Sequence, residues 1–122
     1  MSKPFTFAFL TDPQLGMNSP AGLDAPDSDK ARLCAAVGMI NESDAEFVIL
    51  GGDQIHGGYD VLEDEQAVEE QPDAVESALS GLNVPYYSVP GNHDFGRETD
   101  PRPYTDRGFP MRFTMQHKGV AF

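Results

Sequence analysis

The 122-residue sequence contains one cysteine, few basic residues and no long apolar run. A single cysteine, Cys34, excludes an internal disulfide and a cysteine-based zinc site. The apolar stretch near the N-terminus, Phe5–Leu10, is broken by Thr6 and is too short for a signal-peptide core or a membrane span. Without an export signal or a spanning segment, we expect a cytoplasmic protein that has no membrane partner.

Basic side chains are heavily outnumbered, with eight Lys and Arg against 20 Asp and Glu and a net charge of −12. Residues 1–96 carry 3 basic and 17 acidic side chains (−14), whereas residues 97–122 carry 5 and 3 (+2). Such an acidic surface repels the phosphates of a nucleic acid, so we do not expect duplex nucleic acid as a partner. Binding of a small phosphate would need local positive charge, from a metal ion or from the late arginines.

Short apolar segments alternate with segments of helical spacing. The expected strands are Phe5–Leu10, which we expect to be covered on both faces, Phe47–Leu50 and Pro85–Val89. The apolar residues between them recur at i, i+3, i+4 and i+7 in two sets, Leu33, Ala36, Val37 and Ile40, then Val75, Ala78, Leu79 and Leu82. The order β-α-β-α-β predicts an α/β fold with a parallel sheet.

The boundaries of these helices follow from capping residues. Asp27, Ser28 or Asp29 is expected to cap the first helix, and Pro72 with Asp73 suits the first turn of the second. The acidic run 63–70 is expected to be a solvated helix face. After the third strand we expect a loop over Arg97–Gly108 and then a hairpin, with strands at 113–116 and 119–122 around an exposed turn that contains His117.

Polar side chains follow each expected strand at the point where it ends. They are Asp12 and Gln14, then Asp53, then Asn92 and His93. The carboxyl ends of parallel strands share one edge of a sheet, which is where open α/β sheets bind ligands. Carboxylate, amide and imidazole groups together suit two divalent metal ions (Mn, Fe or Zn), which could clamp a phosphate ester and generate hydroxide near neutral pH.

Each of these signals has a simpler interpretation when it is taken alone. Asp12-Pro13 and Gly52-Asp53 are ordinary turn sequences, and Asn92-His93 after Pro90-Gly91 could be a turn with an incidental histidine. Three such signals in order, each directly after an expected strand, favour a shared site over three unrelated turns.

The same segments carry a resemblance to a known family. The sequences TDPQLG (11–16), GGDQIHG (51–57) and VPGNHDFG (89–96) resemble the first three motifs of the calcineurin-like metallophosphoesterases. That family commonly shows Asp-x-His, Gly-Asp-x-x and Gly-Asn-His-Asp/Glu. Gln14 in place of the usual histidine is similar to an Asp-Pro-Gln sub-branch of the family. The resemblance implies a four-layer α/β/β/α sandwich, of which these residues would form the N-terminal half.

The resemblance also implies roles for individual residues. Asp12 would bind the first metal with Gln14 as a weaker ligand, Asp53 would bridge both metals, and Asn92 would bind the second. His93 would contact the phosphate and assist the leaving group, and Asp94 would orient His93. The implied activity is hydrolysis of phosphate esters by a metal-bound hydroxide at a binuclear site, on a small phosphorylated substrate or a phosphoprotein.

Two departures from the family pattern qualify this interpretation. Family members usually supply further histidines from a second half, including a Gly-His-x-His motif that these 122 residues lack, so we expect a domain truncated at its C-terminal side. His56 could support the site, but we favour an ordinary, satisfied loop histidine. Among the late arginines, Arg97 is the best candidate to contact substrate, although solvated loop charges are the simpler interpretation.

Three functional hypotheses therefore remain. The first is a metal-dependent phosphoesterase. The second is a catalytically silent fragment or a phosphate- or metal-binding module without the C-terminal histidines. The third is a self-assembling chain that completes its sheet by pairing the exposed edge near Val120 with another copy. We favour this one least and expect a monomer, or weak self-association through that edge.

Overall fold

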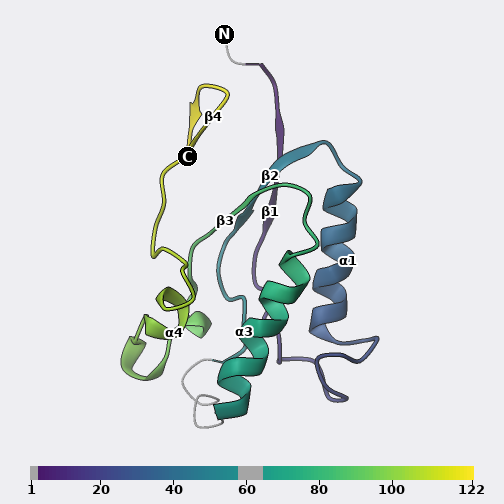
Figure 1. Cartoon of the computed structure of the whole chain (residues 1–122), viewed down its shortest axis with the longest axis vertical. Coiled ribbons are helices and arrows are strands. Elements are labelled where there is room, and N and C mark those ends of the chain that lie inside the picture. The colour runs from purple at the N-terminus through teal and green to yellow at the C-terminus, as the bar shows by residue number, and fades with distance from the viewer. Residues whose placement is uncertain (1–2, 58–64) are drawn as a thin grey trace.

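The described part of the protein is a parallel sheet with helices on one face and the C-terminal segment on the other (Figure 1). It is a computed structural model that describes residues 3–57 and 65–122. Strands β1 (Thr6–Leu10), β2 (Ala45–Leu50) and β3 (Tyr86–Ser88) lie in the order β1-β2-β3. Both pairs are parallel, which confirms the α/β class and the β-α-β-α-β order.

Helix α1 spans Asp29–Asn41, and its N-cap is Ser28, one of the three expected capping residues. The Ser28 hydroxyl accepts a hydrogen bond from the amide of Ala31 at 3.1 Å, which satisfies a donor that the helix itself leaves unpaired. The buried residues of the helix include Leu33, Val37 and Ile40, as the helical spacing predicted.

Helix α3 spans Glu65–Leu79, and its N-terminal boundary differs from the expected one. Pro72 lies in the helix interior, not in the first turn. A proline there lacks the amide hydrogen of a normal helical residue and costs about 3 kcal/mol. Burial of Ala74, Val75 and Ala78 just beyond Pro72 offsets that cost, because these side chains complete the core. Of the acidic run 63–70, Glu69 and Glu70 are exposed as expected, and residues 63 and 64 lie outside the described residues.

The main core lies between the sheet and the two helices, which contact each other. Val48 and Leu50 of β2 are at most 2 % exposed, and they pack with the buried faces of α1 and α3. Within the described residues, no helix has the length and apolar character that a bilayer crossing requires.

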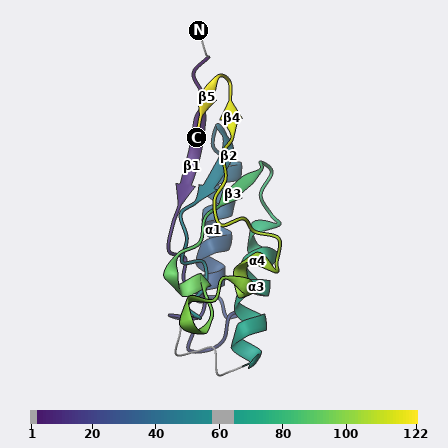
Figure 2. The ribbon, with the colours of Figure 1, turned by 90° about the vertical axis from the view of Figure 1, so that its left-hand side faces the viewer.

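The opposite face of the sheet carries an aromatic cluster. Phe47 is 1 % exposed and its ring lies near the rings of Phe7, His117 and Phe122. Figure 2 shows the C-terminal hairpin in front of the sheet and α1 behind it. The hairpin lies near the start of β1, since His117 also contacts Phe5, and it is therefore remote from the carboxyl ends of the strands.

The hairpin itself is confirmed, with shorter strands than expected: β4 (Gln116–His117) and β5 (Val120–Ala121). The turn is made by Lys118 and Gly119, both at positive φ (48° and 84°), as a type I′ hairpin turn requires. The expectation that His117 is an exposed turn residue was wrong, because its Nε2 lies 2.9 Å from a carboxylate oxygen of Glu46 and its ring packs in the aromatic cluster.

Two further expectations need correction. We expected the first strand to be covered on both faces. Instead, β1 is an edge strand, and on its aromatic face Phe7 and Phe9 remain 39 % and 60 % exposed. Residues 97–108 are not an irregular loop throughout: they contain a 3-10 turn, η2 (Arg97–Thr99), and a short helix, α4 (Arg102–Thr105). Buried Tyr104 anchors that helix.

Candidate functional site

The loops that follow β1 and β2 are bound to each other through their backbones. The Asp12 amide donates to the Gly52 carbonyl and the Gln14 amide to the Asp53 carbonyl, both at 3.0 Å. The pairing continues as an isolated parallel bridge between Leu15 and Ile55. These bonds extend the sheet beyond its regular strands, so the first and second motifs are held side by side as the sequence predicted.

The second and third motifs meet backbone against backbone at two glycines. A Cβ on Gly52 would lie 2.5 Å from the Gly91 nitrogen, and a Cβ on Gly91 would lie 2.0 Å from Oδ1 of Asp53. Gly52 also has φ +100°, which side-chain-bearing residues rarely adopt. The same Oδ1 accepts a hydrogen bond from the His93 amide at 3.0 Å. The Asp53 carboxylate therefore lies directly against the Gly91–His93 turn.

Three of the four expected metal ligands have a left-handed backbone. Asp12, Gln14 and Asp53 have φ values of 57°, 42° and 50°. For residues other than glycine this conformation costs about 1–2 kcal/mol, with Asp and Asn tolerating it best. Non-glycine residues held in this way cluster at functional sites, where surrounding bonds impose the strain. The backbone ladder between the two loops provides such bonds here.

Asp94 is a buried carboxylate that holds the motif loops together. It is 3 % exposed, and it accepts hydrogen bonds from the amides of Gly91 (2.8 Å), Gln54 (2.9 Å) and Ile55 (3.3 Å). Burial raises the pKa of Asp94, while these three hydrogen bonds oppose the rise and the nearby Asp53 charge adds to it. Asp94 thus crosslinks the second and third motifs.

The expectation that Asp94 orients the His93 ring was wrong. Nδ1 of His93 lies 3.2 Å from the backbone carbonyl oxygen of His56, and the two imidazole rings are stacked with centroids 5.5 Å apart. His56 is not a satisfied loop histidine either, since within the described residues its own Nδ1 is buried and has no hydrogen-bond partner. Asn92, the first residue of the 3-10 turn η1 (Asn92–Asp94), is exposed.

A buried polar chain behind the site was not anticipated. The Gln54 side-chain amide donates to the Ser88 hydroxyl, which is 2.7 Å from the Tyr104 hydroxyl. Burial raises the pKa of Tyr104 to about 12, with the Ser88 hydrogen bond opposing the rise. The chain ties α4 to β3 and to the second motif. Periodicity gives no signal for such a contact, because its members occur singly and far apart in the sequence.

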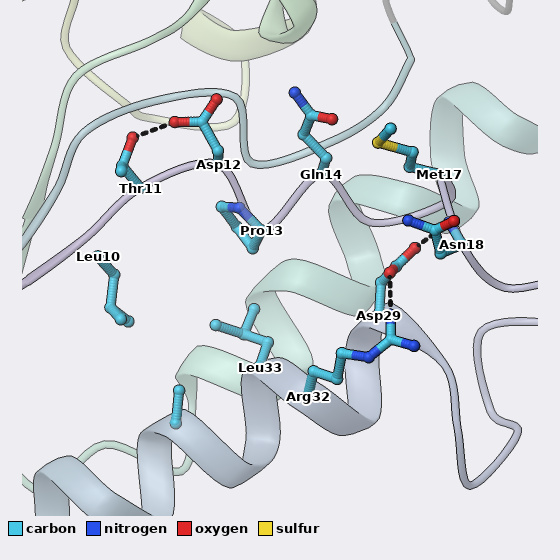
Figure 3. Close-up of a pocket in the computed structure, with 11 residues that line it drawn as sticks. Leu10, Thr11, Asp12, Pro13, Gln14, Met17, Asn18, Asp29, Arg32 and Leu33 are labelled. Carbon is cyan, nitrogen blue, oxygen red and sulfur yellow. Dashed lines mark hydrogen bonds and ion pairs between the residues drawn. The ribbon is translucent and has the colours of Figure 1, made fainter.

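A cavity of about 350 Å³ lies between the loop after β1 and the start of α1 (Figure 3). Its lining is apolar at Leu10 and Leu33 and polar at Asp12 and Gln14. The carboxylate of Asp29, in the first turn of α1, accepts hydrogen bonds from the backbone amide of Asn18 and from the guanidinium of Arg32 (Figure 3). The cavity adjoins the first motif, and the lining residues do not include Asp53 or His93.

Two of the late arginines are committed to ion pairs. Arg102 pairs with Asp100 at 2.6 Å, and Arg107 lies 2.9 Å from Asp73 and 3.3 Å from Glu76 on α3. Arg97 is exposed, three residues after Asp94.

The donor chemistry at this edge fits a divalent metal in kind. Asp12 and Asp53 offer carboxylates, and Gln14 and Asn92 offer amide oxygens, which are ligands that hard cations accept. Across residues 3–57 and 65–122, however, no group of three or more His, Cys, Asp or Glu side chains is placed to hold a metal ion.

Comparison with known proteins agrees with this geometry. No curated protein matches the sequence closely enough to be a relative. A family model for calcineurin-like phosphoesterases matches residues 5–120, and proteins of that family are generally hydrolases that act on phosphate esters with divalent metals. The match includes all three strand-end motifs and most of the C-terminal hairpin. The chain belongs to the calcineurin-like phosphoesterase family.

Proposed function

We propose that this chain provides the catalytic edge of a metal-dependent phosphoesterase, with Asp12, Gln14, Asp53 and Asn92 as metal ligands at a binuclear site. The observation that carries the proposal is the convergence of the three strand-end loops. Hydrogen bonds join the first loop to the second, and the contact of Gly52 with Gly91 joins the second to the third. The left-handed backbone at three of the four ligand positions supports it further.

In this proposal, two divalent ions supply positive charge and activate water when they are bound. Asp53, which lies between the first and third motifs, would bridge the two ions, and Asn92 would bind the second. Gln14 replaces an imidazole with a neutral amide, so we expect weaker binding or a different metal preference at the first site. The Asp12-Pro13-Gln14 sequence also supports assignment to the Asp-Pro-Gln sub-branch.

His93 is the residue that we assign to the leaving group. The hydrogen bond from its backbone amide to the Asp53 carboxylate keeps His93 next to the proposed bridging ligand. A protonated imidazole there can donate a proton to the departing oxygen and stabilise charge that develops on the phosphate. Arg97 is our candidate for a direct substrate contact, because guanidinium groups bind phosphate oxygens in pairs. We infer a small phosphorylated molecule or a phosphoprotein as substrate.

The test is turnover of p-nitrophenyl phosphate and bis-p-nitrophenyl phosphate in Mn²⁺, with and without chelator. We expect metal-dependent hydrolysis, with His93→Ala lowering kcat by about 10²–10⁴-fold. The matched control is His117→Gln, which changes a histidine at the other end of the sheet and should leave kcat unchanged. Hydrolysis that survives both chelation and His93→Ala would refute the proposal.

A silent module is the second candidate. It is favoured by the finding that, among the described residues, no three His, Cys, Asp or Glu side chains lie together in a group that could hold a metal ion. A chain that neither binds metal nor hydrolyses either ester would support this alternative. Weak self-association through the β5 edge would instead appear as a mass that rises with protein concentration in sedimentation.

A further inference from the structure

His56 and His93 face each other across the loops of the second and third motifs. Their rings are stacked, with centroids 5.5 Å apart and planes inclined by 20°. The carbonyl oxygen of His56 lies 3.2 Å from Nδ1 of His93. One residue therefore contacts the His93 side chain in two ways, through its backbone and through its ring.

These contacts have different consequences for the imidazole of His93. A carbonyl oxygen can only accept a hydrogen bond, so Nδ1 of His93 must carry the hydrogen that it donates. The other ring nitrogen, Nε2, is then the one available to exchange a proton with a leaving-group oxygen. Stacking against the His56 ring restricts rotation of the His93 ring out of its observed plane.

We propose that His56 is a positioning residue for His93, whose ring plane and Nδ1–H tautomer it fixes through stacking and through its carbonyl oxygen. The catalytic consequence rests on the proposed function, in which His93 assists the leaving group. The positioning itself is a property of the folded chain and can be measured separately.

The buried Nδ1 atom of His56 indicates which property of the side chain matters. Within the described residues, its Nδ1 is buried and has no hydrogen-bond partner, a condition that lowers stability. A flat apolar ring in its place would remove that unpaired atom and keep the stacking contact. The matched variants are therefore His56→Phe, which retains a flat face, and His56→Leu, which retains apolar bulk without one.

Nuclear magnetic resonance of the histidine side chains tests the positioning. The chain has three histidines, and His117→Gln identifies the signal of the one outside the site. At alkaline pH, where imidazoles are neutral, long-range ¹H–¹⁵N spectra of the 122-residue chain should show His93 protonated on Nδ1. Both variants keep the backbone carbonyl of residue 56, but only His56→Phe keeps a flat ring against His93. We therefore expect His56→Phe to preserve that pattern, and His56→Leu to add the Nε2–H tautomer because the unstacked His93 ring can rotate away from the carbonyl. A His93 spectrum unchanged in His56→Leu, or an Nε2–H tautomer in the wild type, would overturn the proposal.

Kinetics separates this proposal from the proposed function. We expect His56→Leu to lower kcat by about 10-fold with KM within about twofold, and His56→Phe to retain most of kcat, because misplacing a catalytic group mainly affects the chemical step. If His93→Ala abolishes turnover but His56→Leu leaves kcat unchanged, the positioning role fails and the proposed function stands. If neither the wild type nor any variant hydrolyses an ester, but the His93 tautomer still depends on residue 56, the proposed function fails and the positioning role stands.

Discussion

Replacement of Asp94 tests whether this carboxylate holds the motif loops together. Asp94→Ala removes an acceptor that three amides share at 2.8–3.3 Å, and two of those amides belong to the buried residues Gln54 and Ile55. A buried donor left unpaired costs about 1–3 kcal/mol. The three amides do not each carry the full cost, because the loops can relax toward solvent. We therefore expect the free energy of unfolding to fall by about 3 kcal/mol in total.

Asp94→Asn is a milder version of the same change. The asparagine oxygen can still accept from Gln54 and Ile55, but its NH₂ group would face the Gly91 amide, so we expect a loss of about 1–2 kcal/mol. The pH dependence has a defined sign. Because burial raises the folded-state pKa of Asp94, its stabilising contribution is fully present below the unfolded pKa and declines as pH rises through the folded-state pKa. The difference between wild type and Asp94→Asn should therefore be larger in acid than at neutral pH.

Urea unfolding followed by far-ultraviolet circular dichroism measures these losses, since the chain has no tryptophan. Asp44→Asn is the matched control, because Asp44 is exposed and precedes the start of β2, and its effect should stay within about 0.5 kcal/mol. If Asp94→Ala is no more destabilising than this control, or if the Asp94→Asn difference grows toward neutral pH, the assigned role of Asp94 is wrong.

Three other substitutions follow from particular contacts. Gly91→Ala would place a Cβ 2.0 Å from Oδ1 of Asp53, so we expect urea unfolding to show a loss of at least about 2 kcal/mol in stability. Gly38→Ala is the control, because Gly38 has open space around it and the change should be neutral or stabilising. Equal effects of the two substitutions would contradict this expectation. Ser28→Ala removes the α1 cap and should cost about 1 kcal/mol, and no change in the urea midpoint would show that the cap is dispensable. Tyr104→Phe should remove the tyrosine that ionises near pH 12 in an ultraviolet titration, and an unchanged titration curve would contradict its assignment.

The elements that could be predicted from sequence are those that local pattern determines. The helical spacing of Leu33, Val37 and Ile40 fixed the buried face of α1, and the capping preference of Ser28 located its start. The motif residues were predicted to converge because parallel strands align their carboxyl ends, and the backbone ladder between Asp12 and Gly52 confirms this for the first two motifs.

The features that were missed depend on contacts between distant segments. Local propensity places Pro72 at a helix start, yet burial of the residues that follow it keeps the proline inside α3. His117 was assigned to an exposed turn because nothing near it in sequence indicates Glu46 or the aromatic cluster. The partner of His93 was misassigned for the same reason: its sequence neighbour Asp94 turns toward buried amides, and His56 takes its place.

Manganese binding tests most directly whether the three converging motifs form a metal site. Mn²⁺ added to the 122-residue chain can be followed by the loss of the free-ion signal in electron paramagnetic resonance. We predict binding that Asp53→Asn weakens by at least about 10-fold, since asparagine keeps the acceptor for the His93 amide but removes the charge. Asp44→Asn should leave it unchanged. Absence of binding by the wild type, or equal binding by Asp53→Asn, would contradict a metal site at this edge of the sheet.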